Sequence, residues 1–296
     1  MTYPQQGGIV TARPLAFLAF DHRERAFSSV RRAGMTHQQI RDSKELIYEA
    51  FGEALHRGIG DVEPGILVDE QFGGPIARRA IGDGVLVSMP VERANEKVFT
   101  FEYGADYRDH LLEFRPASAK VLVHHRTTDP REQKATQLAR LRELSEFLAA
   151  ESIDFMCELI VGMSGATDGE VPSVDVDALC ASMAEFQEAG ILVTMWKVEG
   201  VALGEGAERI AAQAARTDRP AQCLVLGAGA AADVVQHWLD VSAATTGYSG
   251  FAVGRSFWGD SVSGWLDGTL SRESAIDEIA SRYRSCTLRY MGADAR

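Results

Sequence analysis

A lysine interrupts an apolar run in the second half of the chain and is the residue best suited to covalent chemistry. Lys197 lies in the segment 191–199, and Glu199 follows two positions later. Burial disfavours the ammonium form of a lysine, and a neutral amine can form a Schiff base with a carbonyl substrate. Period-two alternation along a strand places Lys197 and Glu199 on one face. A buried Lys–Glu ion pair without a catalytic role is the alternative that this segment also allows.

The composition restricts the classes of protein to which the chain can belong. Hydrophobic residues make up 46% of the 296 residues, enough for a large core, and the formal net charge is −12. This acidic balance argues against a nucleic-acid surface but permits a local basic pocket for an anionic ligand. The first residues lack the basic and apolar regions of a signal peptide, and no apolar run is long enough to span a bilayer.

The cysteines are widely spaced and form no CxxC pair of the metal-binding kind. They are Cys157, Cys180, Cys223 and Cys286. Such spacing is typical of reduced thiols in the cytosol. We therefore expect a soluble cytoplasmic protein without a membrane or nucleic-acid partner, and association into a homo-oligomer stays open.

Eight short β-rich runs alternate with helical stretches along the chain. The expected strands span residues 15–21, 65–69, 84–88, 119–124, 155–161, 192–198, 223–226 and 250–254. Helical spacing covers residues 44–56, 134–148, 176–188 and 230–239. Near-continuous apolar strands in this alternation predict a (β/α)8 TIM barrel of the α/β class rather than a doubly wound sheet. Nothing divides the chain, so residues 1–296 are expected to form one domain, with the 93–115 connection on the catalytic face.

Ionisable groups collect where the expected strands end, which is where TIM barrels place their active sites. They are Asp21 and His22, Asp69, Lys120 with His124, Glu158, Lys197 with Glu199, and Arg255. One polar strand end is ordinarily a solvated edge, but six such ends on one barrel indicate a functional site.

Two of these residues have the chemistry to assist a Schiff-base lysine. Glu158 is the one ionisable residue of 155–161, and an inward glutamate could shuttle protons during carbinolamine formation and carbon–carbon cleavage. Lys120 could supply a second cation, which disfavours the ammonium form of a neighbouring lysine. A structural ion pair is the alternative for Glu158. For Lys120, its position early in the strand favours a lysine that enters from solvent at the bottom of the barrel.

The remaining candidates concern substrate binding. Asp21 and Asp69 either orient substrate hydroxyls or cap the helix that follows. The loops after the seventh and eighth strands contain Gly227, Ala228 and Gly229, and then Gly254 and Arg255. Backbone amides in such loops, with an arginine fork, suit a phosphate group, although glycines also serve ordinary turns.

A metal site is not expected from the histidines. His124 and His125 are adjacent, and adjacent strand residues point to opposite faces, so they should not chelate one ion. No other metal-type spacing occurs, and we expect neither a metal nor another cofactor.

Six short blocks resemble those of the class I, Schiff-base aldolases of the tagatose-bisphosphate aldolase superfamily, which also includes sulfofructose-phosphate aldolase. They are LAFDHR at 18–23, LVDEQFG at 67–73, PVE at 90–92, FEYG at 101–104, WKVE at 196–199 and GFAVGR at 250–255. The chain is most similar to the aldolase-like domain fused to a sugar kinase in inositol catabolism. That domain is associated with 5-dehydro-2-deoxy-6-phosphogluconate.

The resemblance implies a metal-independent lyase that cleaves a phosphorylated ketose or keto-acid to dihydroxyacetone phosphate and an aldehyde. It makes Lys197 the Schiff-base residue, Glu158 the acid/base group and Lys120 the auxiliary cation. Substrate contacts are expected from Asp21, His22, Asp69 and Glu199, and anion contacts from the Gly227 and Arg255 loops.

The resemblance leaves the substrate open. Tagatose-bisphosphate aldolases tend to carry Gln where this chain has His22, and the kinase half of the inositol fusion has no counterpart here. Sulfofructose-phosphate and tagatose-bisphosphate are therefore alternative substrates. A metal-dependent (class II) aldolase and a non-catalytic sugar-phosphate-binding barrel are the alternative functions.

Overall fold

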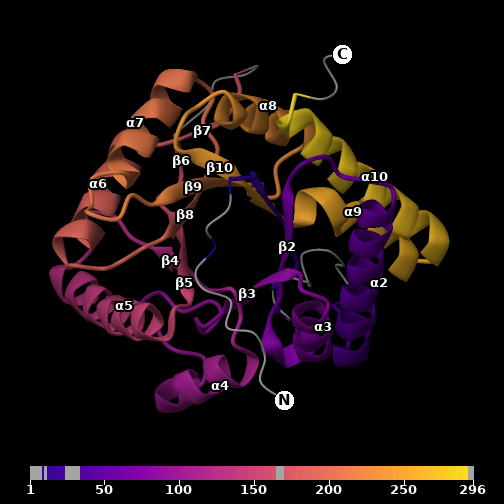
Figure 1. The fold of residues 1–296 in the computed structure, drawn as a ribbon, viewed down its shortest axis with the longest axis horizontal. Helices are drawn as coiled ribbons and strands as arrows, with labels where there is room; N and C mark the ends of the chain where they lie inside the picture. Colours follow the sequence, from indigo (N-terminus) through magenta and orange to yellow (C-terminus); the bar gives the residue numbers. More distant parts are fainter. Residues whose placement is uncertain (1–8, 10–11, 24–33, 165–169, 293–296) are drawn as a thin grey trace.

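Eight parallel strands close into a barrel at the centre of the molecule (Figure 1). The computed structural model describes residues 9, 12–23, 34–164 and 170–292. In chain order the barrel strands are β1 (Leu15–Ala19), β2 (Glu63–Leu67), β3 (Leu86–Pro90), β4 (Ser118–His124), β5 (Asp154–Ile160), β8 (Met195–Val198), β9 (Gln222–Leu226) and β10 (Tyr248–Val253). Around the barrel their order is β1-β10-β9-β8-β5-β4-β3-β2. The expected TIM barrel is confirmed, as a single domain.

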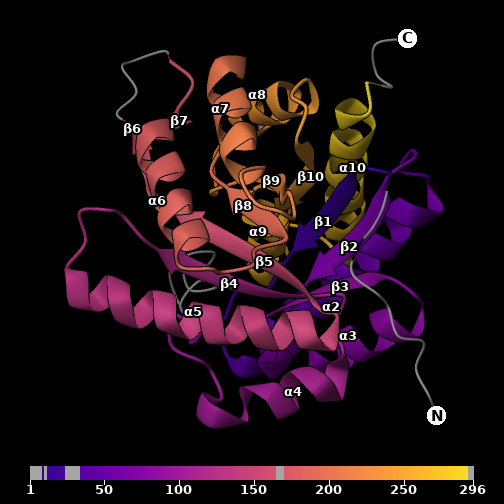
Figure 2. The same cartoon turned by 60° about the vertical axis from the view of Figure 1, so that its left-hand side comes forward.

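Helices surround the barrel on all sides (Figures 1 and 2). They are α2 (His37–His56), α3 (Glu70–Gly82), α4 (Tyr107–Phe114), α5 (Arg131–Glu151), α6 (Val176–Glu188), α7 (Gly204–Ala214), α8 (Ala232–Ala243), α9 (Arg255–Leu266) and α10 (Arg272–Tyr290). A 3-10 turn, η1 (Gly104–Asp106), precedes α4. Two short antiparallel strands, β6 (Met163–Ser164) and β7 (Ser173–Val174), pair outside the barrel. None of the helices in the described ranges combines the length and apolar character needed to cross a membrane.

Every expected strand overlaps an observed one, with ends that differ by up to three residues. The largest difference is at β8, which begins at Met195 rather than at residue 192, because the Val193 amide turns back to the carbonyl of Ile191. The helix expected over 44–56 begins earlier, at His37, since Thr36 caps it in a capping box with Gln39. The helix expected over 176–188 is observed with those bounds.

The lower part of the barrel interior is apolar and tightly filled. Its buried side chains are Leu15, Phe17, Met156, Met195, Leu224 and Ala252. A Cβ on Gly65 would lie 2.5 Å from the Phe17 ring, so only glycine fits beside that ring. These residues close the interior from below, whereas the ionisable side chains of Lys120, Glu158 and Lys197 line a cavity at the other end.

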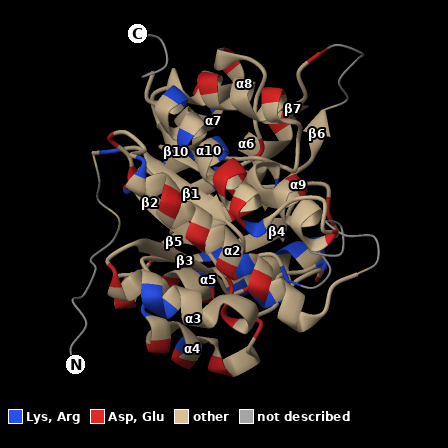
Figure 3. Ribbon diagram, turned by 90° about the vertical axis from the view of Figure 1, so that its right-hand side faces the viewer, with Lys and Arg blue, Asp and Glu red and all other residues tan. Residues whose placement is uncertain are grey.

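The outer helices carry the surface charge. Figure 3 shows acidic and basic positions interspersed on α2, α3 and α4. Several of these charges pair between helices, as in Arg79 with Glu45 and Arg272 with Glu49. Exposed pairs of this kind contribute little to stability, about 0–1 kcal/mol each. The charged groups that matter for chemistry lie inside the barrel mouth.

Candidate active site

A cavity of about 290 Å³ opens at the carboxyl ends of the strands. Its lining residues come from β1, β4, β5, β8 and the connection after β3: Asp21, His22, Arg23, Glu92, Arg93, Ala94, Asn95, Glu96, Lys120, Leu122, His124, Glu158 and Lys197. A larger hollow of about 900 Å³ lies at the amino ends of the strands, near Asp154 and Thr194. The smaller cavity is the candidate site, because it alone of the two contains a cluster of buried lysines and carboxylates, and barrel enzymes bind substrate at that end.

Lys197 projects from β8 into this cavity. Its strand pairs with β5 so that Lys197 lies directly opposite Glu158, and Lys197 Nζ is 3.0 Å from Glu158 Oε1. The lysine side chain is 6% exposed. An ion pair between Lys197 and Glu199 on the same strand was the alternative that the sequence allowed. Lys197 pairs instead with the carboxylate of the neighbouring strand, which is the contact expected for Glu158.

Glu158 connects two lysines. Its second oxygen, Oε2, is 2.9 Å from Lys120 Nζ. Burial alone would raise the pKa of Glu158, but the adjacent Lys120 and Lys197 ammonium groups outweigh burial and lower that pKa below its usual range. Glu158 is therefore held as a carboxylate with both oxygens occupied.

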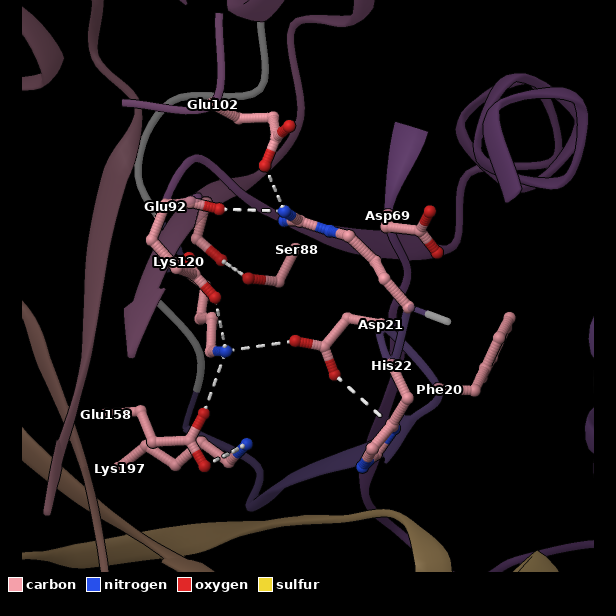
Figure 4. Close-up of polar contacts among 12 residues, drawn as sticks. Phe20, Asp21, His22, Asp69, Ser88, Glu92, Glu102, Lys120, Glu158 and Lys197 are labelled. Carbon is pink, nitrogen blue, oxygen red and sulfur yellow. Dashed lines mark hydrogen bonds and ion pairs between the residues drawn. The ribbon is translucent and has the colours of Figure 1, made fainter. Parts of the chain in front are cut away.

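Lys120 lies at the centre of the cluster (Figure 4). Its Nζ is 2.9 Å from Asp21 Oδ2 and 3.0 Å from Glu92 Oε1, in addition to its contact with Glu158. Burial opposes its charge, but the carboxylates of Asp21, Glu158 and Glu92 raise the pKa of Lys120 well above its usual value. Lys120 therefore stays a fixed ammonium group. The interpretation that it enters the strand from solvent at the bottom of the barrel is wrong, since its side chain reaches up to the carboxyl end.

Asp21 and His22 follow β1 and line the same cavity. Burial would raise the pKa of Asp21, but Lys120 and Lys197 lower it well below its usual range. Burial, together with the nearby Arg255 cation, lowers the pKa of His22 to about 3 despite the neighbouring Asp21. His22 is thus a neutral imidazole at pH 7, with its ring edge-on to Trp258 at a centroid distance of 5.2 Å.

Asp69 and Glu199 hold the backbone, and neither lines the cavity. Asp69 is 1% exposed, accepts a hydrogen bond from the Phe72 amide at the start of α3, and pairs with Lys44 at 2.6 Å. Glu199 Oε2 accepts the amides of Val161 (3.1 Å) and Gly162 (2.9 Å). For Asp69 this geometry favours the helix-capping alternative. The substrate contacts that the resemblance implied for Asp69 and Glu199 stay predictions, and neither residue is in the cavity lining.

The two glycine-containing loops meet beside the cavity. Ala228 and Gly229 have positive φ values of 49° and 71°, and the Arg255 guanidinium lies 3.3 Å from where a Gly229 Cβ would be. A Cβ on Gly254 would lie 3.0 Å from the His22 ring and 2.5 Å from the Ala19 carbonyl oxygen. The expected anion-binding residues Gly227, Ala228, Gly229, Gly254 and Arg255 are therefore next to the cavity, joined to it through His22, rather than in its lining.

Arg255 is also the first residue of α9. The amino end of a helix and a guanidinium group both favour an anion, so this corner is suited to a phosphate or sulfonate. The His22 ring lies beside Gly254 of this corner, and His22 also lines the cavity of the lysine cluster.

His124 and His125 point in opposite directions, as expected. His124 lines the cavity, whereas His125 is buried between α5 and α6, with its Nε2 2.7 Å from Glu185. Within the described ranges no group of three or more His, Cys, Asp or Glu residues is arranged to hold a metal ion.

Two residues of the cavity lining, Glu92 and Arg23, had no role expected from the sequence. Glu92 accepts a contact from Lys120, and its backbone oxygen accepts the Arg23 guanidinium at 2.9 Å. Arg23 also pairs with Glu102. Both residues come just after a barrel strand, like Asp21 after β1, and that position was the signal that could have identified them.

The comparisons with known proteins agree with the barrel and name no reaction for this chain. A family profile described as "Uncharacterized protein conserved in bacteria (DUF2090)" matches residues 10–291. No curated protein is detectably similar to the chain.

Two solved structures illustrate the likeness of fold. The fructose-bisphosphate aldolase of Plasmodium falciparum, solved with TRAP and a small-molecule inhibitor, superposes with a TM-score of 0.68 at 13% identity, over 94% of this chain and 90% of that one. The protein Cgl0159 of Corynebacterium glutamicum superposes with a TM-score of 0.60 at 19% identity, over 92% of this chain and 86% of that one.

Proposed function

The chain belongs to the DUF2090 family, and we propose that it is a class I aldolase that forms a Schiff base on Lys197. One observation carries the proposal: Lys197 Nζ lies in a cavity at the carboxyl end of the barrel, 3.0 Å from a carboxylate that a second buried lysine also contacts. A lysine, a carboxylate and a fixed cation are the groups that imine chemistry requires. The aldolase-like barrel supports the same reading.

The reaction starts with attack of the neutral Lys197 amine on the substrate ketone. The proton of Lys197 passes to Glu158 Oε1, the nearest base, at 3.0 Å. Glu158 then gives a proton to the carbinolamine hydroxyl, which leaves as water while the iminium forms. Lys120 remains charged and contacts Glu158 while that carboxyl group gains and then loses its proton.

Cleavage follows from the positive charge of the iminium. The hydroxyl on the carbon beyond the breaking bond loses its proton to a carboxylate, and its oxygen becomes the aldehyde carbonyl. The electrons of the carbon–carbon bond move to the iminium, which becomes an enamine. Protonation of that enamine and addition of water release the ketone product and restore Lys197.

The substrate we propose is a phosphorylated ketose or keto-acid, such as 5-dehydro-2-deoxy-6-phosphogluconate, with dihydroxyacetone phosphate as the ketone product. The loops of Gly227 and Arg255 would hold the anionic group, and Asp21 with His22 would contact the substrate between that corner and Lys197. Sulfofructose-phosphate and tagatose-bisphosphate are the alternative substrates, because a sulfonate or a second phosphate would suit the same corner. A cleavage screen of these compounds, with coupled detection of dihydroxyacetone phosphate, would identify the substrate.

The direct test is reduction with borohydride in the presence of dihydroxyacetone phosphate, followed by peptide mapping. The chain offers few acceptors, since its lysines are Lys44, Lys97, Lys120, Lys134 and Lys197. We expect the reduced adduct on Lys197 alone. Lys44 is the internal control, because it too is buried beside a carboxylate but is not in the lining of this cavity. An adduct on another lysine, or none, would refute the proposed function.

Two other functions make opposite predictions for the same protein. A metal-dependent (class II) aldolase would lose activity with a chelator and would survive borohydride with dihydroxyacetone phosphate. A non-catalytic sugar-phosphate-binding barrel would be stabilised against heat by these compounds without cleaving any of them. The proposed aldolase should be inactivated by borohydride and be insensitive to chelator.

A further inference from the structure

The three carboxylates around Lys120 differ in what their second oxygen contacts. The second oxygen of Glu158 pairs with Lys197 at 3.0 Å, and that of Asp21 is 3.9 Å from His22 Nδ1. Glu92 uses Oε1 for Lys120, and its Oε2 is buried with no hydrogen-bond partner among the residues that the structure describes. Among these three, Glu92 is therefore the one whose second oxygen contacts no charged or hydrogen-bonding group of the described residues.

The backbone around Glu92 is fixed from several sides. Glu92 pairs with Phe101 in an isolated antiparallel bridge, and its carbonyl oxygen accepts Arg23 Nη1 at 2.9 Å. The Val91 amide donates to the Lys120 carbonyl oxygen at 3.0 Å. The side chain lines the cavity and is 11% exposed. A carboxylate held so firmly at the cavity wall is preorganised for a contact with substrate.

An unpaired buried carboxylate oxygen is costly, so such an atom in a cavity points to a donor that arrives with the ligand. A sugar hydroxyl is the donor that the proposed substrates supply. Burial raises the pKa of Glu92 despite the nearby Lys120 and Arg23 cations, whereas the pKa values of Asp21 and Glu158 are lowered. Where two carboxyl groups in one site have pKa values shifted in opposite directions, one typically transfers protons and the other stabilises charge.

On the basis of the proposed aldolase function, we infer that Glu92 is the catalytic base for carbon–carbon cleavage, with Oε2 as the atom that accepts the proton of the substrate hydroxyl. The hydroxyl O–H bond breaks and its proton goes to Oε2. The oxygen's electron pair forms the aldehyde C=O, and the carbon–carbon bond electrons pass to the iminium to give the enamine. In the condensation direction the protonated Glu92 returns that proton to the aldehyde oxygen. Glu158 keeps the imine steps, since both its oxygens contact lysines.

The test separates imine formation from cleavage. Glu92→Gln keeps the shape of the side chain and an oxygen for Lys120, but removes the base. We expect borohydride trapping of dihydroxyacetone phosphate on Lys197 to stay within about threefold of wild type. The rate of cleavage should fall about 10²- to 10⁴-fold for whichever of 5-dehydro-2-deoxy-6-phosphogluconate, sulfofructose-phosphate and tagatose-bisphosphate the wild type cleaves. Glu113→Gln, on the exposed face of α4, is the matched control and should change neither rate.

Three outcomes would overturn the inference or its premise. Unchanged cleavage by Glu92→Gln would show that another group accepts the proton. Parallel loss of trapping and cleavage would show that Glu92 only positions Lys120. Failure of the wild type to trap dihydroxyacetone phosphate would instead refute the proposed function, whatever the variant does. The melting temperature of Glu92→Gln should match or exceed that of wild type, because the change removes a buried charge. A lower melting temperature would reveal a folding defect independently of the two rates.

Discussion

The buried pairs Lys44–Asp69 and Lys197–Glu158 lie in different parts of this barrel, and of these two the second has the surroundings of an active site. Lys44 on α2 is 0% exposed, pairs with Asp69 at 2.6 Å, and donates to the carbonyl oxygens of Phe20 and His22. Lys197 on β8 pairs with Glu158 at 3.0 Å, and both line a cavity. Burial and pairing are the same in the two cases. The two pairs differ in their other surroundings. Lys44 and Asp69 also make hydrogen bonds with backbone groups, whereas Lys197 and Glu158 line a cavity that could hold a ligand.

The backbone contacts of the Lys44–Asp69 pair indicate a structural role. Asp69 caps α3, and Lys44 fixes the chain where β1 ends, just before the cavity residues Asp21 and His22. Burial lowers the pKa of Lys44 even with Asp69 beside it. A buried lysine is thus insufficient to identify a nucleophile. The cavity and the additional charges around Lys197 make the distinction.

The largest expected effect is the loss of chemistry when Lys197 is removed. Lys197→Met should lower cleavage by at least about 10⁴-fold and abolish borohydride trapping, since the nucleophile is gone. Its free energy of unfolding should stay within about 1 kcal/mol of wild type, because Glu158 keeps Lys120 as a partner. Steady-state kinetics and urea unfolding of the same preparation measure both quantities. A variant that retains cleavage would place the nucleophile elsewhere.

The opposite pattern is expected for Lys44. Lys44→Met leaves the Asp69 carboxylate buried without its cation, so the free energy of unfolding should fall by about 3–5 kcal/mol. Cleavage per folded molecule should fall far less than in Lys197→Met. Adding Asp69→Asn should recover part of the stability, because asparagine removes the buried charge and still caps α3. If Lys44→Met were as stable as wild type but inactive, the contrast between the two lysines would fail.

The barrel itself was predictable, because β-rich and helical segments alternate eight times and each strand is apolar on both faces. The approach of Glu158 to Lys197 followed from placing them on adjacent strands. The contacts of Lys120 with the carboxylates did not follow from the sequence. Lys120 lies near the amino end of β4, and only the register of β4 with β3 and β5 brings it to the carboxylates. Glu92 was assigned no role because the third strand was expected to end at residue 88, four positions before it. Such contacts depend on the register between neighbouring strands and on how far each side chain extends. The sequence of a single strand does not specify that register.

A smaller effect is expected at the anion corner. Arg255→Ala should raise KM about ten- to a hundredfold, because one charge-assisted contact contributes about 1.5–3 kcal/mol. Arg255→Lys should recover only part, since ammonium lacks the planar fork. The melting temperature should barely change. Reduced stability with unchanged KM would give Arg255 the same structural role as Lys44 and remove it from the site.

The smallest expected effect concerns His22, whose carbonyl oxygen accepts a hydrogen bond from Lys44 and whose ring lies beside Gly254. Its folded pKa of about 3 is below the unfolded value near 6.5, so the unfolded chain binds more protons at pH 5. Stability from the neutral ring is present above pH 6.5 and is lost as the pH falls towards 3. At pH 5 the loss should be about 2 kcal/mol relative to pH 7.5.

His22→Gln cannot titrate in this range, so its free energy of unfolding should fall by about 2 kcal/mol less than that of wild type between pH 7.5 and pH 5. Urea unfolding of both proteins at the two pH values gives this difference, and the other histidines cancel because both chains contain them. An identical pH dependence would mean that the His22 ring takes up its proton in the folded state near its ordinary pKa. At pH 5 the ring would then be a cation beside Arg255, although it would still be mostly neutral at pH 7.5.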